Sequence, residues 1–445
     1  MARGRKKETL TPEERLQAAL VPESEQPYPV PGNWCWAYLT KGAAECLDSF
    51  RKPINASERA NREGDIPYYG ATGQVGWIDD FLTNEQLVLV GEDGAPFLDV
   101  IKDKAYIIEG KAWVNNHAHI LRSRFGAVGN LFLMHYLNIF NYHDFVNGTT
   151  RLKLTQGSMD TMPVPLPPLP EQQRIVDRIE SLFARLDEAK QKAQDALDSF
   201  ETRKAAILHK AFTGELTAQW RKERGVGMES WKNVSVSEIC HSLKYGTAKK
   251  SSSEGTVVVI RMGNLQDGEI NWDDLAYSND EEDIEKFKLV PGDVLFNRTN
   301  SPALVGKTSI YRGEYPAIYA GYLIKLGYDR SRIIGDYLNY SLNTISAKEH
   351  CNSVKTDGVN QSNINAKKIG AYVFTMPKIN EQTEIVRILD NLLAKERQAK
   401  EAAEGVLEQI GLIKKAILAR AFRGELGTND PSDESEVLAL LQCDS

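Results

Sequence analysis

Cysteine is scarce in this sequence, and none of the cysteines stands where a metal or disulfide site would need it. They are scattered singly along 445 residues, with no C-x-x-C pair and no histidine at metal-binding spacing. The five are Cys35, Cys46, Cys240, Cys351 and Cys443. We therefore expect buried or idle thiols, and we predict neither metal ligands nor a disulfide framework.

Long hydrophobic runs are also lacking. No apolar stretch approaches the roughly 20 residues that span a bilayer. The first residues, MARGRKKETLTPEERLQ, are basic but lack the apolar segment of a secretory signal behind them. We therefore expect a protein that stays in the cytoplasm. At 445 residues, with 42% hydrophobic and 26% charged residues, the chain should form two to four globular domains.

An overall excess of basic charge is missing as well. The formal net charge is −7, and the run from Asp267 to Glu285 holds nine acidic residues and no basic one. The tail after Gly427 is acidic too, and its composition predicts disorder. Without these two stretches the remainder is close to neutral or mildly basic. Any surface that binds DNA must therefore be local, or shared with a basic partner.

No catalytic motif in the sequence is more complete than chance matches would be. The string VGKTS (Val305–Ser309) resembles the end of a phosphate-binding loop, but the glycine required five residues earlier is replaced by Ser301. The acidic turn Glu92–Gly94 is not followed by the E-x-K of a nuclease, and no N-P-P-[FY] methyltransferase motif is present. His117 and His119 lack an evident partner carboxylate or cysteine, which favours loop residues over metal ligands. We predict no catalytic, cofactor-binding or metal-binding residue.

What the sequence does contain is a long internal repeat. The stretches Glu171–Leu216 and Glu381–Leu426 lie 210 residues apart and share 19 of 46 positions without a gap. In both copies apolar residues recur with a period of 3.5, which predicts two long helices with one apolar seam each. The predicted helix-pairing residues are Ile175, Ile179, Leu182, Leu186, Ala189, Ala193, Ala196, Phe200 and Ile207, with Ile385, Leu389, Leu392, Ala399, Ala403, Val406, Ile410, Ile413 and Ile417.

The ends of the two helices are marked in the sequence. The proline-rich run Pro163–Pro170 precedes the first copy, Asn380 is the expected N-cap of the second, and Gly214 and Gly424 should end them. About 40 helical residues give a rod of roughly 60 Å. A dimerisation coiled coil between chains is one interpretation. Pairing within the chain is favoured because the copies are tethered.

If the two helices pair antiparallel, the polar interruptions of the seam should meet. Arg203 lies near the end of the first copy, and Glu396 lies near the start of the second. Such pairing would bring the guanidinium and the carboxylate together.

Before each helical copy lies a variable segment of mixed pattern, 23–165 and 225–376. Short β-prone runs separated by Gly, Asn and Asp turns predict compact α+β domains. The runs are 86–91, 105–110, 256–262 and 292–298. Each segment opens with a tryptophan, Trp34 or Trp231, and closes on a Gln-bearing stretch, so the two domains are predicted to be one fold that has diverged.

The loops of both variable segments are rich in side chains that can read base edges. Arg and Lys donate to guanine, Asn and Gln pair with adenine, and lysine clusters suit phosphates. For any single residue, a solvated turn is the competing interpretation. The DNA-binding candidates are Tyr68, Tyr69, Thr72, Gln74, Asn115, Asn116, His117, Arg122, Arg124, Lys153 and Gln156 in the first segment, and Lys244, Tyr245, Lys249, Lys250, Arg298, Asn300, Ser301, Lys307, Lys355, Asn360, Gln361 and Asn363 in the second.

Several segments resemble the specificity subunits of type I restriction–modification systems. They are LPPLPEQQRIV, MPKINEQTEIV, the AFTGEL and AFRGEL that end the helices, and LVPGDVLFNRTNSPALVGKT. The resemblance implies two target recognition domains that each read half of a bipartite double-stranded DNA site. It also implies an antiparallel coiled coil that sets the gap and docks two methyltransferase subunits. The chain itself would be non-catalytic.

The resemblance also implies the partners and cofactors of the complex. The methyltransferase subunits would use S-adenosylmethionine to methylate adenine at N6, and restriction subunits bound through them would need ATP and Mg²⁺. The competing hypotheses are a protein-binding scaffold, with two adaptor domains on a coiled-coil hairpin and no DNA role, and an enzyme with an unrecognised site.

The predicted fold class is α+β, with two mixed domains joined by two long antiparallel helices in a pseudo-two-fold repeat. The expected regions are an N-terminal arm (1–22), target recognition domain 1 (23–165), helical region 1 (166–224), target recognition domain 2 (225–376), helical region 2 (377–427) and an acidic tail (428–445). In the arm, Thr11 as N-cap and Pro12 in the first turn predict a short helix that pairs with a partner.

Overall fold

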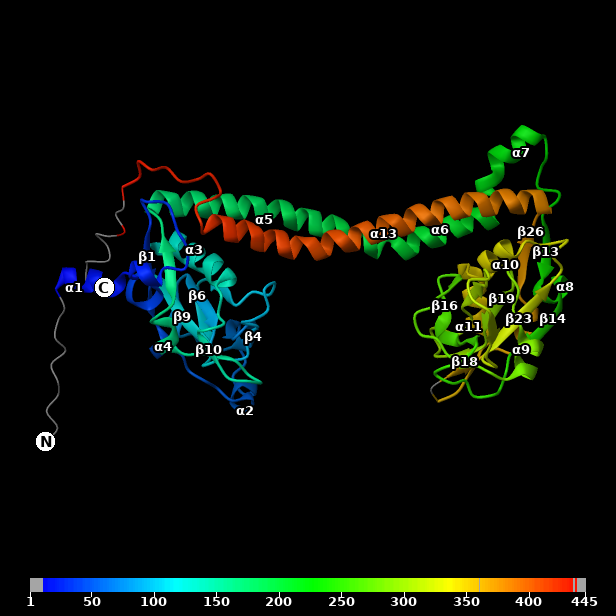
Figure 1. Cartoon of the computed structure of the whole chain (residues 1–445), viewed down its shortest axis with the longest axis horizontal. Coiled ribbons are helices and arrows are strands. Elements are labelled where there is room, and N and C mark those ends of the chain that lie inside the picture. The colour runs from blue at the N-terminus through cyan, green and yellow to red at the C-terminus, as the bar shows by residue number, and fades with distance from the viewer. Residues whose placement is uncertain (1–10, 360, 435–436, 438–445) are drawn as a thin grey trace. The chain divides into compact units, whose positions relative to one another are not determined.

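The chain folds into two compact units, each containing one globular domain of helices and strands (Figure 1). The computed structural model describes residues 11–359, 361–434 and 437. The first unit is Met1–Gln194 with Glu404–Ser445, and the second is Asp195–Ala403. Within the described residues, no helix combines the length and the apolar character needed to cross a membrane. The expected class, two α+β domains, is confirmed.

The first domain is centred on strand β6 (Leu87–Gly91), in which every residue is buried. Its uninterrupted apolar run suits a strand that is covered on both faces. β6 lies inside a sheet of order β2-β9-β6-β7, and α3 (Gly126–Ile139) packs on that sheet (Figure 1). A second sheet has the order β4-β3-β8-β5.

The remaining elements of this domain are short. They are β1 (Cys35–Tyr38), β2 (Ala44–Cys46), α2 (Ala56–Ala60), β3 (Ile66–Gly70), β4 (Gly73–Ile78), β5 (Thr83–Asn84), β7 (Ala105–Ile108), β8 (Lys111–Val114), β9 (Ala118–Ser123), β10 (Val146–Asn147), β11 (Lys153–Leu154), α4 (Gln156–Met159) and β12 (Pro163–Leu166).

The second domain is centred on β19 (Val294–Asn297), which is also fully buried. Its sheets have the orders β14-β23-β19-β21-β17-β16, β18-β15-β22 and β20-β25-β24. The other elements are α7 (Ala218–Arg224), β13 (Lys232–Ser235), α8 (Val236–Ile239), β14 (Cys240–Tyr245), β15 (Val257–Ile260), β16 (Leu265–Gln266), β17 (Glu269–Ile270), β18 (Tyr277–Ser278), α9 (Glu281–Phe287), β20 (Thr299–Asn300), β21 (Thr308–Ile310), β22 (Ala317–Tyr319), β23 (Leu323–Tyr328), α10 (Gly335–Leu342), α11 (Ile345–Val354), β24 (Thr356–Asp357), β25 (Ser362–Asn363), α12 (Ala366–Gly370) and β26 (Val373–Met376).

The two domains share a framework of strand pairings. β6 lies between β9 and β7, as β19 lies between β23 and β21, and all four pairings are antiparallel. β3 pairs with β8 in parallel, as β15 pairs with β22. The first and last strands also pair in both domains, β1 with β12 and β13 with β26. These repeated pairings confirm the prediction that one fold has diverged.

The helical repeats form α5 (Leu169–Asp198), α6 (Phe200–Phe212) and α13 (Ile379–Ala421). The first copy is therefore not one continuous helix. It is interrupted at Ser199, whose hydroxyl donates to the carbonyl of Asp195 at 2.7 Å, a local bond that competes with helical geometry. The predicted cap Asn380 is also wrong, because α13 already begins at Ile379.

The C-terminal ends of the helices follow the prediction. Gly214 (φ +82°) and Gly424 (φ +72°) both adopt left-handed backbone conformations just beyond α6 and α13. Glycine occupies that conformation without the steric cost of a Cβ atom.

The apolar seam of α13 departs from the predicted register. Ala399, Val406 and Ile413 are exposed, the last two by 41%, so their assignment as pairing residues is wrong. Leu393 and Leu418 are buried instead. A strict 3.5-residue repeat drifts around a straight helix of 3.6 residues per turn, so the predicted stripe rotates out of the contact. The other predicted pairing residues are buried or half-buried, with Ile175, Ile179, Phe200, Ile385, Leu389, Ala403 and Ile410 buried.

The predicted disorder of the tail is wrong for its first residues. Thr428 donates to the buried carboxylate of Glu171 at 2.6 Å, and Asn429 accepts from the indole of Trp34 at 3.0 Å. Arg174 forms an ion pair with Asp433. The segment 428–433 is thus held by hydrogen bonds and an ion pair to other parts of the first unit. Residues 435–436 and 438–445 lie outside the described part of the chain.

The N-terminal arm contains the predicted short helix, α1 (Pro12–Ala19). Thr11 accepts from the backbone of Glu14, whose carboxylate accepts in turn from the backbone of Thr11. This capping box and the proline at the first turn explain the start of the helix. Its pairing with a partner remains a prediction.

Candidate nucleic-acid interface

In the first domain, a hairpin and a neighbouring turn bring several candidates together. Thr72 and Gln74 are exposed at the β3–β4 turn. The backbone N–H of Asn115 donates to the carbonyl of Tyr69 at 3.1 Å, which places the turn after β8 beside this hairpin. Asn116 is exposed on that turn.

Two of these DNA-binding candidates, Tyr68 and Asn115, are buried inside the domain. Tyr68 is buried, with the guanidinium of Arg59 4.9 Å from its ring, so its assignment as a DNA contact is wrong. Asn115 is buried too, and its side-chain oxygen Oδ1 accepts from the backbone N–H of His117 at 2.8 Å. Alternation along a strand turned Tyr68 inward, while Tyr69, on the other face, is half-buried beside Tyr106.

Glu92 and Asp93 lie directly after β6, and their carboxylates form ion pairs with residues of the turn after β8 and of the segment around β11. Asp93 Oδ1 lies 2.7 Å from Nδ1 of His117 and 2.8 Å from Nη2 of Arg151. Lys153 Nζ lies 2.9 Å from Oε1 of Glu92. The expectation that His117 lacks a carboxylate partner is therefore wrong. His117 and Lys153 share one surface, while Gln156 is exposed at the start of α4.

Arg122, on β9, and Arg124, directly after β9, lie in different surroundings. Arg122 forms ion pairs with Glu85 (2.5 Å) and Glu45 (3.1 Å), and the hydrogen bonds that it donates to Glu85 raise its pKa. Three of its five N–H donors are therefore used within the chain. Arg124 is half-buried, and its Nε is enclosed without an acceptor in the described structure.

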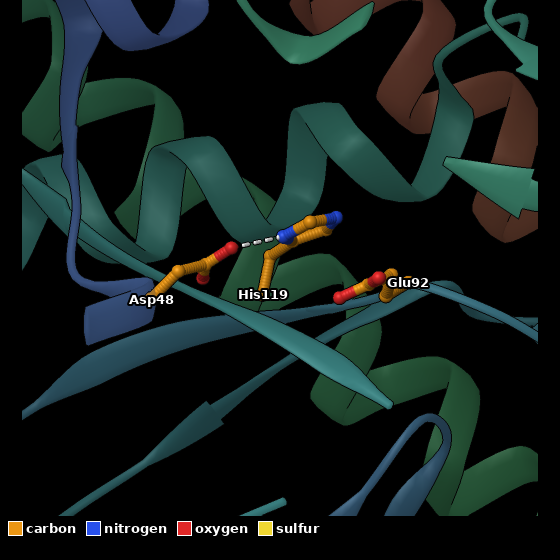
Figure 2. A group of neighbouring side chains, drawn as sticks. All are labelled: Asp48, Glu92 and His119. Atoms are coloured by element: carbon orange, nitrogen blue, oxygen red, sulfur yellow. Dashed lines mark hydrogen bonds and ion pairs between the residues drawn. The ribbon is translucent and has the colours of Figure 1, made fainter. Parts of the chain in front are cut away.

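His119 belongs to the one group of described side chains with the composition of a metal site, Asp48, Glu92 and His119 (Figure 2). Asp48 Oδ2 lies 2.6 Å from Nδ1 of the imidazole, so the expectation that His119 lacks a carboxylate partner is also wrong. The ring's Nε2 lies 2.9 Å from the carbonyl oxygen of Leu154. Both ring nitrogens therefore already face oxygen atoms of the protein at hydrogen-bond distance.

A guanidinium already supplies the positive charge of this group. Arg51 forms ion pairs with both Asp48 (2.9 Å) and Glu92. Burial raises the pKa of Asp48, but the hydrogen bond and charge of His119 and the charge of Arg51 outweigh burial and lower it. The pKa of Glu92 is lowered against burial in the same way, by Lys153 and Arg51. The group is therefore a closed ion-pair network and does not fit a metal ion.

In the second domain, the small sheet β20-β25-β24 gathers candidates that are far apart in sequence. Thr299 donates to the side-chain carbonyl of Asn363 at 2.6 Å, and Asn300 pairs with Ser362. Lys355 Nζ donates to the carbonyl of Pro302 at 3.1 Å. The candidates that this sheet and its flanks bring together are Arg298, Asn300, Ser301, Lys355, Gln361 and Asn363.

Tyr245 lies beside this group at the end of β14. The guanidinium carbon of Arg298 is 4.9 Å from its ring centroid, and its hydroxyl accepts from the backbone of Ala366 at 3.0 Å. Tyr245 is 41% exposed. A guanidinium over the face of an aromatic ring gains cation–π attraction, which favours this position of the Arg298 side chain.

The lysine candidates of this domain fall into two groups. Lys249 is bound by Asp280 at 2.8 Å, and Lys307 donates to the amide oxygen of Gln266 at 2.7 Å. Lys244 and Lys250 are exposed, which suits phosphate contacts. Asn360 lies outside the described residues.

Two exposed aromatic residues at these surfaces were missed from the sequence. Trp77 on β4 is 56% exposed and Tyr322, just before β23, is 50% exposed. Each follows a glycine, in VGW and AGY. The only hint in the sequence was an aromatic residue directly after a glycine. Buried aromatic residues can follow a glycine as well, so this pattern alone does not identify an exposed one.

Comparisons with known proteins agree with this arrangement. The family model of the type I restriction modification DNA specificity domain matches residues 45–197 and 228–405. The chain is 26% identical over 331 residues to the type I restriction enzyme EcoKI specificity subunit of Escherichia coli (strain K12), covering 70% of each chain.

Two solved structures show the same fold. The HsdS subunit of Thermoanaerobacter tengcongensis matches with a TM-score of 0.56 at 19% identity, over 91% of this chain and all of that one. A chain from a study of the assembly and conformational transition of the type I R-M system matches with a TM-score of 0.64 at 18% identity, over 90% of this chain and all of that one.

Proposed function

Because the chain belongs to the family of type I restriction modification DNA specificity domains, we propose that its two globular domains each read one half of a bipartite double-stranded DNA site. One observation carries this proposal. The domains repeat the same strand pairings around β6 and β19, yet they present different polar side chains beyond those strands. A shared scaffold with different surface groups suits two readers of different sequences.

The paired helices would set the gap between the half-sites. In the first unit Lys414 of α13 lies 2.6 Å from Asp187 of α5, and in the second unit Arg203 of α6 lies 2.8 Å from Glu396 of α13. Both contacts fit an antiparallel coiled coil in which each copy of the repeat lies against the other. Such a pair acts as a spacer of fixed length.

The repeated helical faces would each dock one methyltransferase subunit, which gives two copies per chain. Restriction subunits would bind through those subunits. The chain itself would be non-catalytic. S-adenosylmethionine, ATP and Mg²⁺ would belong to the partners, which would also supply much of the phosphate contact that a chain of net charge −7 lacks.

The test is to map methylated adenines in cells that carry the methyltransferase subunit with and without this chain. The proposal predicts a bipartite adenine mark that disappears with the chain and returns when the chain is supplied again. A methylation pattern that does not depend on the chain would contradict the proposal and favour a protein-binding scaffold.

A further inference from the structure

Arg298 occupies a defined backbone position at the edge of the second domain. Its N–H donates to the carbonyl of Tyr322 at 3.0 Å, and its carbonyl accepts from the N–H of Ile364 at 2.8 Å. Arg298 directly follows the central strand β19, and its two backbone partners lie next to β23 and β25. Three strands therefore fix the position of its main chain. Its side chain lies on Tyr245, and both Tyr245 and Tyr322 are exposed.

The guanidinium of Arg298 keeps donors that are not used within the described structure. Its Nε is buried without an acceptor, and its Nη1 makes one long hydrogen bond, 3.4 Å, to the carbonyl of Gly321. No carboxylate among the described residues forms an ion pair with it. Arg122 and Lys249, in contrast, are neutralised by acidic neighbours.

In the first domain, the same backbone position holds a side chain of opposite charge. The N–H of Glu92 donates to the carbonyl of His117 at 2.8 Å, and its carbonyl accepts from the N–H of Leu154 at 2.7 Å. Glu92 follows β6 as Arg298 follows β19. The shared framework thus keeps the position and changes the side chain, as expected where two domains read different bases.

We infer that Arg298 is the side chain with which the second domain reads a guanine. This inference rests on the proposed function. A planar guanidinium fork matches the O6 and N7 acceptors that guanine presents in the major groove. The cation–π contact with Tyr245 restrains the side chain before DNA binds, which reduces the entropy lost on binding.

The experiment maps adenine methylation by the complete complex with the wild-type chain, Arg298→Ala and Arg298→Lys. The second half-site should contain a G·C pair at which Arg298→Ala loses roughly ten- to hundredfold preference, while the first half-site stays unchanged. Arg298→Lys should lose much of the same preference, because lysine has neither the fork nor the planar stacking surface.

Arg330 provides a matched control, since its guanidinium also lies over a tyrosine, 5.7 Å from the ring of Tyr328, but is bound by Asp293. Arg330→Ala should leave both half-sites unchanged. A uniform weakening by Arg298→Ala that Arg298→Lys restores would mean a phosphate contact and would overturn the inference. So would an unchanged motif in both variants. Absence of any chain-dependent bipartite mark with the wild-type chain would instead contradict the proposed function.

Discussion

Nε of Arg203 lies 2.8 Å from Oε2 of Glu396, so two residues 193 positions apart meet between α6 and α13. Arg203 also donates to the carbonyl of Ala196 at 3.1 Å and to the hydroxyl of Ser199, where the first helical copy is interrupted. This arginine therefore links the interruption to the neighbouring helix. The meeting of the two charges was predicted from their opposite places in the repeat.

Exchange of these two charges should show how much the ion pair contributes to the free energy of unfolding. Arg203→Glu should lower the free energy of unfolding by about 1 kcal/mol, because two carboxylates would then face each other across a partly exposed contact. Arg203→Glu combined with Glu396→Arg should recover most of that loss. The measurement is urea unfolding of the single and double variants. Additive losses in the double variant would show that the pair is not coupled.

Glycine substitutions inside α13 and just beyond its C-terminal end should act with opposite signs. Gly405 lies inside the helix, and a Cβ added there would meet no other atom within 4 Å, so Gly405→Ala should stabilise the chain by about 0.5–1 kcal/mol. Gly424 has φ +72°, and a Cβ there would collide with the ring of Pro31. Gly424→Ala should therefore cost at least about 2 kcal/mol. Thermal unfolding compares the two variants, and equal shifts would contradict the assigned conformations.

Acid should weaken the first domain through its ion-pair network. The folded-state pKa of Asp48 is lowered, so its contribution to stability is present above the unfolded pKa of about 3.9 and is lost as pH falls through the folded value. Asp48→Asn should therefore flatten the loss of stability below about pH 4. At neutral pH the same variant should cost about 3 kcal/mol, because His119 stays buried without its carboxylate.

The measurement for Asp48 is urea unfolding of both proteins between pH 3 and pH 7. Asp144→Asn is a suitable control, since Asp144 pairs with His143 at an exposed contact of 3.4 Å. Parallel pH profiles for the wild type and Asp48→Asn would rule out the network as the source of the acid sensitivity.

Lengthening the paired helices should lengthen the gap in the DNA site. Four residues inserted into α5 near Ala193, with four more inserted into α13 near Ala403, add about 6 Å, which is one to two base pairs. Methylation mapping should show both half-sites unchanged and a longer gap. Four residues inserted in the exposed loop at Gly225 serve as the control and should leave the gap as it is. An unchanged gap with the helix insertions would contradict the spacer role.

Local patterns in the sequence were sufficient to predict the central strands and the C-terminal ends of the helices. Apolar runs predicted β6 and β19, and Gly214 and Gly424 marked the ends of α6 and α13 because no other residue adopts φ > 0 as readily. The seam register failed at Val406 because a small difference in period accumulates along a long helix.

The composition of the candidate interface could be predicted only in part, because its contacts are non-local. Arg122 resembles a base reader in sequence, but the fold places Glu45 and Glu85 against it from 77 and 37 residues away. Asn363 reaches Thr299 across 64 residues. No local pattern encodes such pairings, so the candidates that remain available to DNA become evident only after folding.

The tail of the chain should contribute to the stability of the first unit. Burial raises the pKa of the Glu171 carboxyl, while hydrogen bonds from Thr428 and Arg174 lower it, so Thr428 stabilises a charge inside the protein. Thr428→Val should cost about 1.5–3 kcal/mol, the range for a hydrogen bond to a charged group. A chain that ends at Gly427 should lose more, because the contacts of Asn429 and Asp433 disappear with it.

Two controls separate this effect from general weakening. Ser432→Ala removes a hydroxyl that donates to the exposed Asp430 at 2.7 Å, and it should leave the unfolding transition nearly unchanged. Thr217→Val removes the equivalent hydroxyl of the second unit, 2.7 Å from Glu381, which keeps hydrogen bonds from Arg221 and Trp231. Its cost should therefore be smaller than that of Thr428→Val. If the chain ending at Gly427 unfolds like the full chain, the tail does not hold the helix end, and Glu171 is satisfied by Arg174 alone.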